Sequence, residues 1–230
     1  MKNKKVSGLL YTAVMGVAVL SLASCAEKKF RVNGIITQAK DSVLYLENMS
    51  LNGPKAVDSV KLDENGEFEF SQKAPEAPEF YRLRIANQMV NLAVDSTENI
   101  TVKAAYPTMS ANYEVNGSEE CTKIRDLAYM QLELQTHVAA IANSSSLGVQ
   151  AVEDSVAKVL EVYKNKVKLN YIFKEPMKAY AYYALFQTIV LGNANILIFN
   201  PRSSKDDVKV FAAVATSWDT YFPKAERGLN

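Results

Sequence analysis

Histidine and cysteine are scarce in this chain of 230 residues, which contains one histidine and two cysteines. A catalytic zinc site typically takes three protein ligands, commonly several histidines or cysteines, so a zinc enzyme is not expected. The nine glycines form neither a G-x-G-x-x-G nor a G-x-x-x-x-G-K pattern, and the cysteines form no C-x-x-C. A phosphate-binding loop is therefore not predicted. We expect neither a metal ion nor a cofactor.

The chain also has no excess of charge of either sign, since it contains 26 lysines and arginines and 25 acidic residues and its formal net charge is +1. Residues 1–24 contain three lysines and no acidic residue, so their removal would change the net charge to −2. No basic tract would remain to neutralise a row of phosphates, and a nucleic-acid partner is not expected. With 48% hydrophobic residues, the chain can build one or two domains with a core.

The beginning of the chain has the pattern of a secretory signal peptide. Three lysines lie among the first five residues, and residues 6–22 carry no charge. The string "LASC" at residues 22–25 resembles the bacterial lipobox, in which a peptidase cuts before the cysteine and the thiol receives a diacylglycerol. An uncleaved transmembrane helix is the alternative, because about 17 apolar residues is at the lower limit for crossing a bilayer. We predict a signal peptide over residues 1–24, a lipid on Cys25 and a linker over residues 25–29.

The second cysteine, Cys121, would then be the only free thiol, and no intramolecular disulfide could form. It lies in the predicted first turn of a helix, where the helix dipole would lower its pKa and increase its reactivity. The alternative is a small, partly buried residue on the inner face of that helix. We favour this structural role for Cys121.

Residues 30–116 are rich in β-branched and aromatic residues, several of them in period-two alternation. Asn65 and Gly66 in the string "DENG" stand between two alternating runs and predict a β-hairpin. Eight candidate strands at spacings of about ten residues favour an antiparallel β-sandwich or an open barrel. They are residues 30–39, 41–49, 56–62, 66–71, 79–85, 89–95, 99–105 and 112–117.

Residues 117–230 change to a helical period and predict a helical domain, so that the whole chain has an α+β fold. Ser118 is the expected N-cap of the first helix, and Ser203 or Ser204 that of the last. A second helix is expected over residues 152–167, and a largely apolar third helix over residues 176–192. The expected inner stripes are Ile124, Leu127, Gln131 (a polar break), Leu134, Val138 and Ile141 in the first helix and Val208, Phe211, Ala215 and Trp218 in the last.

The candidate catalytic residues do not form a clear constellation. The single histidine, His137, lies one position off the inner stripe of the first helix and would need partners from elsewhere in the fold. The pairs Glu119-Glu120 and Asp206-Asp207 fall in predicted first turns, where negative charge complements the helix dipole, so a glycosidase-like role is less favoured. We predict no catalytic residue.

Two further groups have structural and functional interpretations. Asp58-Ser59 and Asp95-Ser96 could suggest calcium or a catalytic triad, but such pairs near strand ends ordinarily form local hydrogen bonds. Four aromatic residues of the third helix could stack on a sugar, although a helix this apolar more often places them in the core. They are Tyr180, Tyr182, Tyr183 and Phe186.

The ordered set of strings resembles one family, the lipid-anchored thiol-disulfide oxidoreductases of Gram-negative anaerobes, in its N-terminal β domain of unknown function. The strings are "FRVNGII" (30–36), "VLYLE" (43–47), "VDSVKLDENGEFEF" (57–70), "PEFYRLRI" (78–85), "LAVDSTENITV" (92–102) and "YEVNGSEEC" (113–121). In those proteins a helical segment similar to residues 118–222 follows, and then a thioredoxin-like domain with a C-x-x-C. This sequence has no position that matches that motif, and "PKAERGLN" at residues 223–230 is expected to start a helix that would be too short to be stable alone.

The resemblance implies a membrane-anchored periplasmic lipoprotein that acts as a non-catalytic tether or platform for a thioredoxin-like disulfide reductase. Its expected location is the outer membrane, because Ala26 rather than aspartate follows Cys25. The expected partners are the membrane, through the lipid, and a thiol-disulfide oxidoreductase or another envelope protein. The alternative is an envelope binding module for a glycan, a peptide or a protein.

Overall fold

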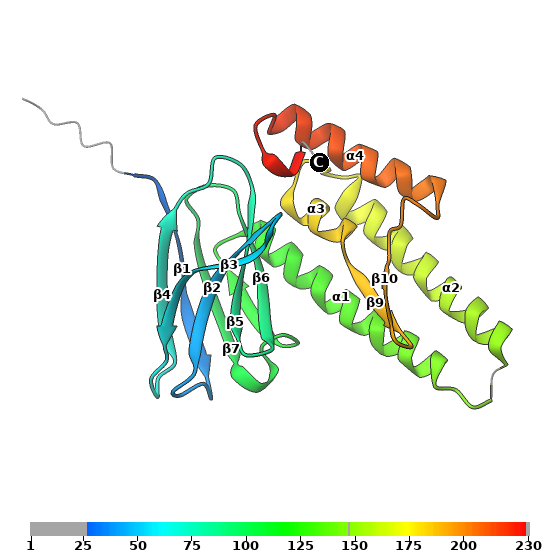
Figure 1. Cartoon of the computed structure of the whole chain (residues 1–230), viewed down its shortest axis with the longest axis horizontal. Coiled ribbons are helices and arrows are strands. Elements are labelled where there is room, and N and C mark those ends of the chain that lie inside the picture. Colours follow the sequence, from blue (N-terminus) through cyan, green and yellow to red (C-terminus); the bar gives the residue numbers. More distant parts are fainter. Residues whose placement is uncertain (1–26, 147, 229–230) are drawn as a thin grey trace, which may run out of the picture.

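The computed structural model describes residues 27–146 and 148–228, and shows an N-terminal β-sandwich followed by helices (Figure 1). The α+β class and the order of its two parts are as predicted. The signal peptide expected over residues 1–24 and the lipidation expected at Cys25 lie outside the described residues.

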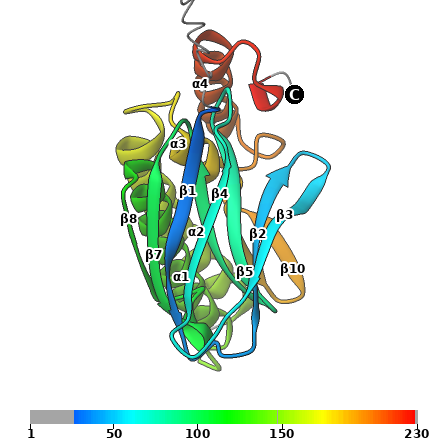
Figure 2. The same cartoon turned by 90° about the vertical axis from the view of Figure 1, so that its left-hand side faces the viewer.

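All eight predicted strands are present in the sandwich, where they form two four-stranded sheets. One sheet has the order β4-β1-β7-β8 and faces the viewer in Figure 2, and the other has the order β3-β2-β5-β6. The strands are β1 (Lys29–Thr37), β2 (Val43–Ser50), β3 (Gly53–Lys61), β4 (Glu67–Lys73), β5 (Glu79–Ile85), β6 (Gln88–Val94), β7 (Asn99–Ala105) and β8 (Tyr113–Asn116).

The prediction of a hairpin at Asn65-Gly66 is wrong, because this turn connects β3 in one sheet to β4 in the other. The carboxylate of Asp63 accepts hydrogen bonds from both backbone N–H groups of the turn, at 2.9 and 3.1 Å. The carbonyl of Gly66 accepts from the N–H of Ile36, and a Cβ on Gly66 would lie 2.0 Å from the Ile36 oxygen. The turn therefore packs against β1 instead of folding β4 back on β3.

The sandwich is also not purely antiparallel, since β1 and β7 pair in parallel, with Val32 opposite Ile100. All other strand pairs are antiparallel among the residues that the structure describes. The inner faces of the two sheets share one core, in which the rings of Phe30 from β1 and Tyr81 from β5 lie 4.9 Å apart. Alternation of apolar and polar residues along the strands supplies these inner faces.

The helical part contains α1 (Glu119–Ala142), α2 (Val149–Val167), a π-helical turn at Lys168–Ile172, α3 (Ala179–Leu185), α4 (Lys205–Tyr221) and a 3-10 turn at Glu226–Gly228. The predicted N-cap Ser118 is confirmed, and of the two candidates for the last helix, Ser203 and Ser204, the cap is Ser204. The side chain of Ser118 accepts from the N–H of Cys121 at 3.2 Å, and that of Ser204 accepts from the N–H of Asp207 at 3.3 Å. Among the described residues, no helix is long and apolar enough to span a membrane.

The third helix is shorter than predicted and a β-hairpin follows it. α3 ends at Leu185, and β9 (Thr188–Leu191) and β10 (Ala194–Leu197) pair across the two-residue turn Gly192-Asn193. The β-branched run Thr-Ile-Val favours a strand over a helix. Gly192 supplies the positive φ of 60° that such a tight turn requires.

The stripe predicted for α4 is displaced around the helix. Val210, Val214 and Trp218 are its buried apolar residues, whereas Val208 is exposed and Phe211 is half-buried. α4 thus has an apolar stripe in the core and a second apolar stripe that faces outward.

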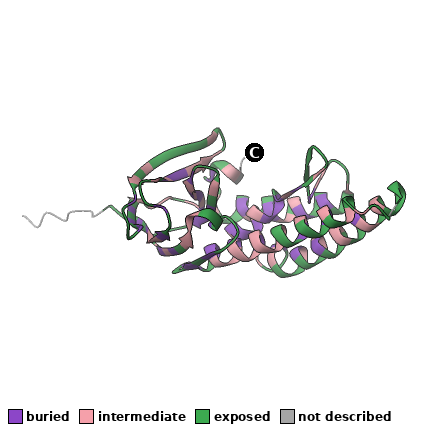
Figure 3. Ribbon diagram, turned by 90° about the horizontal axis from the view of Figure 1, so that it is seen from below, coloured by how far each residue is buried: buried purple, intermediate pink, exposed green. Residues whose placement is uncertain are grey.

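The outer face of the β5-β6 sheet packs on the helices, so that the sandwich and the helical part share a second core (Figure 3). Phe80 of β5 and Ala93 of β6 belong to this core together with residues of all four helices. α1 runs beside β6, and this contact fixes the position of the helices relative to the sheet.

Candidate functional site

A cavity of about 540 Å³ lies between the outer face of the sandwich and the helices, and an adjoining cavity of about 360 Å³ lies between α3 and α4. Both are lined by Tyr182, Phe186 and Arg227, and we call them together the aromatic cleft. The larger cavity is further lined by residues 49–51, Phe80, Tyr81, Asn91, Leu92, Gln131, Tyr183, Gln187 and Thr188, and the smaller one by Leu185, Pro201, Val208, Phe211, Ala212, Val214, Ala215 and Trp218.

Contacting rings form the wall of the aromatic cleft. The ring of Tyr182 lies 5.5 Å from that of Phe80, 4.8 Å from that of Trp218 and 5.0 Å from that of Phe186, measured between centroids. Phe186 continues the series to Phe211 at 5.8 Å, and 51% of Phe186 is exposed. Such ring contacts are each worth about 1 kcal/mol beyond area burial, so the wall is fixed before any partner binds.

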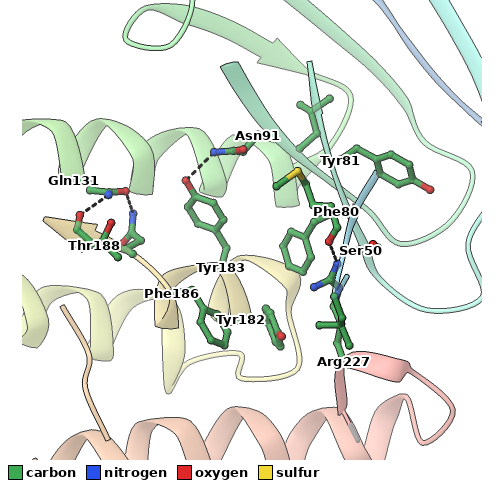
Figure 4. A pocket seen from close by; sticks show the side chains of 14 residues that line it. Ser50, Phe80, Tyr81, Asn91, Gln131, Tyr182, Tyr183, Phe186, Thr188 and Arg227 are labelled. Atoms are coloured by element: carbon green, nitrogen blue, oxygen red, sulfur yellow. Dashed lines mark hydrogen bonds between the residues drawn. The ribbon is translucent and has the colours of Figure 1, made fainter. Parts of the chain in front are cut away.

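Arg227 holds the C-terminal 3-10 turn against the sandwich (Figure 4). Its guanidinium carbon lies 5.0 Å from the ring centroid of Phe80 and 5.9 Å from that of Tyr182. It donates a hydrogen bond to the carbonyl of Met49 and another, of 3.3 Å, to the carboxylate of Glu79. Arg227 is the only residue with a formal charge that lines the cleft in the described part of the chain.

Amide side chains form the polar wall. Gln187, which is 3% exposed, donates to the carbonyl of Leu127 at 3.0 Å and to the side chain of Gln131 at 3.1 Å, and accepts from Tyr163 at 2.7 Å. This network of neutral groups fixes the orientation of the amides. The cleft is therefore suited to a partner or ligand that combines apolar groups with neutral hydrogen-bonding groups.

Three of the four aromatic residues that the sequence analysis singled out line this cleft, namely Tyr182, Tyr183 and Phe186. Tyr183 accepts a hydrogen bond from Asn91 of β6 at 3.3 Å, so it joins α3 to the sandwich (Figure 4). Tyr180 is buried elsewhere, and its hydroxyl donates to Glu175 at 2.5 Å.

Cys121 lies in the first turn of α1 and is fully buried against β6. Its thiol donates to the carbonyl of Ala93 at 3.2 Å and accepts from the N–H of the same residue at 3.4 Å. Burial raises the pKa of the thiol to about 12, so the expectation that the helix dipole lowers this pKa is wrong. Cys121 closes the edge of β6 and has the structural role that we favoured.

One carboxylate of the first predicted pair has a partner in the helical core. Glu120 is buried, and it accepts from the backbone N–H of Tyr180 at 3.0 Å and contacts Lys178 Nζ at 3.5 Å. Burial raises the pKa of Glu120. Glu119 is exposed and occupies the first turn of α1, as the capping interpretation predicts. Glu120 therefore does more than complement the dipole, because it ties α1 to α3.

The second carboxylate pair is divided in the same way. Asp206 is exposed, and its hydrogen bond with Lys209 lowers its pKa. Asp207 is 1% exposed and accepts from Lys164 Nζ at 2.6 Å and from the N–H of Asn200 at 2.8 Å. This contact connects α4 to α2, which the sequence did not predict.

The remaining candidates lie apart from the cleft and from one another. His137 is exposed on α1, and the carboxylate of Asp58 accepts locally from the N–H of Ser59 at 2.8 Å. The backbone N–H groups at positions 95 and 96 donate to the carboxylate of Glu98, each at 3.0 Å. Within the described residues, histidine, cysteine and acidic side chains do not gather in groups of three that could hold a metal ion.

A charged cluster that the sequence did not reveal lies on the same outer face of the sheet. Glu47 is buried and accepts from Arg82 Nε at 2.5 Å and from Arg84 Nε at 2.8 Å. Burial opposes ionisation of Glu47, but the two arginines outweigh it and lower its pKa.

Residues 30–123 match the family described as "Domain of unknown function (DUF4369)". The matched range covers β1 to β8 and continues into the first turn of α1, which includes Cys121. No curated protein matches the chain significantly.

Proposed function

We propose that the chain is a lipid-anchored lipoprotein of the outer membrane that faces the periplasm, and that its described part is a non-catalytic platform for a thioredoxin-like thiol-disulfide oxidoreductase. The aromatic cleft carries this proposal. A pre-formed wall of rings beside an outward apolar stripe is the type of surface that binds another protein. The redox context rests on the resemblance in the sequence, because the family matched at residues 30–123 is described as a domain of unknown function.

The docking surface consists of Phe186 and the outward stripe of α4. Phe186 exposes half of its surface between the two cavities, and Val208, Phe211 and Ala215 continue the apolar surface along α4. Exposed aromatic residues in a well-packed setting are typical anchors of an interface. We therefore expect the partner to contact Phe186.

Site-specific photo-crosslinking tests this docking in intact cells. A photoreactive phenylalanine analogue at position 186 is expected to crosslink to a protein with a thioredoxin-like domain. Position 162 on α2 is the control, because Val162 is also apolar and is 71% exposed, but does not line the cleft. Equal crosslinking from both positions, or a partner without that domain, would contradict the platform function.

The anchor is tested separately by metabolic labelling with a fatty acid. Cys25→Ser is expected to abolish incorporation of the label and to release the protein from the membrane fraction, whereas Cys121→Ser should leave both unchanged. Label that persists in Cys25→Ser would refute the lipidation site.

The non-catalytic part of the proposal is tested by an insulin-reduction assay. We expect no turnover, because the Cys121 thiol is buried and its pKa is raised to about 12. Turnover that disappears in Cys121→Ser would show that the chain is itself a redox catalyst.

A second candidate function is that of an envelope binding module for a glycan or a peptide. The cavity of about 540 Å³ favours it, because the cavity combines aromatic rings with polar side chains. Calorimetric titration with neutral oligosaccharides is expected to show binding that Phe186→Ala abolishes and Val162→Ala preserves. No binding to any sugar or peptide tested would count against this function.

A further inference from the structure

Side chains of α1 close the outer edge of the β9-β10 hairpin on the β9 side. The side chain of Gln135 accepts from the N–H of Val190 at 2.7 Å and donates to the carbonyl of the same residue at 3.0 Å. Gln131 donates to the carbonyl of Thr188 at 2.6 Å. These glutamines occupy the hydrogen-bonding positions that a neighbouring strand would fill, as Cys121 does for β6.

The register then fixes which groups of β10 point away from β9. In an antiparallel pair, residues alternate between hydrogen-bonded and non-hydrogen-bonded positions. Val190 bonds to α1, so the N–H and C=O of its partner Asn195 face outward, and the same holds for Leu197 two residues on. The bond from the N–H of Ile198 to the carbonyl of Gln187 confirms this phase. The described part of the chain supplies no partner for the four outward groups.

Other sheet edges of the molecule carry features that prevent strand addition. β3 contains Pro54 and Lys55, β4 contains Glu67 and Glu69, β8 contains Glu114, and α1 covers the edge of β6. Proline, charge and a covering helix are the usual protections of an edge. β10 has the sequence Ala-Asn-Ile-Leu, with neither a charged residue nor a proline, and all four residues are exposed.

A groove of about 490 Å³ lies between α2, the C-terminal half of β10 and the segment that leads into α4. Figure 1 shows the hairpin between α1 and α2, with β9 on the side of α1 and β10 on the side of α2. The apolar residues Ala157 and Leu160 of α2 line the groove together with Ile196 of β10. Polar groups border it, among them Lys164, which is held by Asp207, and Lys168.

We propose that an extended segment of a partner polypeptide binds in this groove as a third strand beside β10. Its main chain would pair with the four outward groups of Asn195 and Leu197, over a length of roughly 13 Å for four residues. One uncharged, apolar side chain of the segment would pack on Leu160. A single strand with no neighbour on its other side fits, because α2 bounds the groove there. A second copy of this chain would bring its own hairpin with α1 and α2 attached.

Selection from a random heptapeptide library tests the proposal, with the full chain immobilised in detergent. We expect enriched peptides that alternate apolar and polar residues. Asn195→Pro should weaken their binding at least about tenfold, because it removes one outward N–H and places a ring in the path of the added strand. Val190→Thr is the matched control, since it changes the exposed face of the hairpin but not the edge, and should change binding less than about twofold.

Three further measurements make the outcome decisive. Hydrogen exchange at the amide of Ile198 reports whether the hairpin persists in Asn195→Pro. Leu160→Arg places a long side chain in the groove from α2 and should abolish binding without changing β10. Failure to enrich any peptide would overturn the proposal, as would peptides that bind Asn195→Pro and Leu160→Arg as well as they bind the wild type. Peptides lost only in Phe186→Ala would belong to the aromatic cleft and would also refute binding at β10.

Discussion

Cys121 offers the sharpest test of the described structure, through its reaction with an alkylating agent. The thiol is fully buried and its pKa is raised to about 12, whereas an ordinary thiol has a pKa of about 8.5. The thiolate population at pH 8 therefore falls by roughly three orders of magnitude relative to an exposed cysteine. Alkylation should proceed only through unfolding of the first turn of α1 or of the whole protein.

The assay is alkylation with iodoacetamide at pH 8, in buffer and in urea, followed by mass spectrometry of the peptide that contains Cys121. Peptide mapping keeps any reaction of Cys25 separate. We expect the native rate to be at least about a thousandfold below the rate in urea. A native rate within about tenfold of the unfolded rate would refute the reasoning and would reopen a redox role for Cys121.

The same pKa predicts how stability depends on alkaline pH. Above the ordinary thiol pKa, the unfolded state releases a proton that the folded state retains, so the free energy of unfolding falls as pH rises towards 12. At pH 10.5 the expected loss relative to Cys121→Ser is about 3 kcal/mol, because that pH lies about two units above the ordinary thiol pKa and each unit is worth about 1.4 kcal/mol. Urea denaturation of both proteins at pH 8 and pH 10.5 measures this difference, and parallel curves for the two would contradict it.

Three other substitutions test the fold around the site. Glu47→Gln should lower the free energy of unfolding by about 2 kcal/mol at pH 7, because two arginines lose their partner. This loss should shrink as the pH falls through the lowered pKa of Glu47, and urea denaturation that shows the same loss throughout the acid range would contradict this. Gln135→Ala should leave the N–H and C=O of Val190 without their side-chain partner. The local free energy of opening at the Val190 amide should fall by about 1 kcal/mol, so that its hydrogen exchange becomes faster. Unchanged exchange would contradict the closed edge of β9. Gly34→Ala should prevent folding, because a Cβ would lie 1.8 Å from a carbonyl oxygen of β7 at a φ of +151°, whereas the control Gly148→Ala has open space; circular dichroism of the two variants decides.

The features of the fold that depend on residues close together in the sequence could be predicted from the sequence. Period-two alternation predicted the eight strands of the sandwich, and the capping preference of serine predicted Ser118 and one of the pair Ser203 and Ser204 as caps. Pairing between distant strands could not be predicted. The turn at Asn65-Gly66 has the local chemistry of a hairpin, but its contact with Ile36 of β1 decides where β4 goes.

The aromatic cleft was only partly predictable for the same reason. Tyr182, Tyr183 and Phe186 attracted attention as a local group of rings, and Gln131 as a polar break in an apolar stripe. The role of Arg227 could not be predicted from the sequence, because the contacts of this single arginine with the rings of Phe80 and Tyr182 arise only in the folded structure.

The parallel pairing of β1 with β7 has a consequence for the order in which the protein assembles. β2 and β3, and likewise β5 and β6, are joined by two-residue turns and can form soon after synthesis. β1 lies between β4 and β7, and its second neighbour ends only at Ala105. Closing so long a loop is slow relative to forming a hairpin. The first of the described strands is thus among the last to be paired on both sides, and its insertion completes one sheet and closes the core between the two sheets.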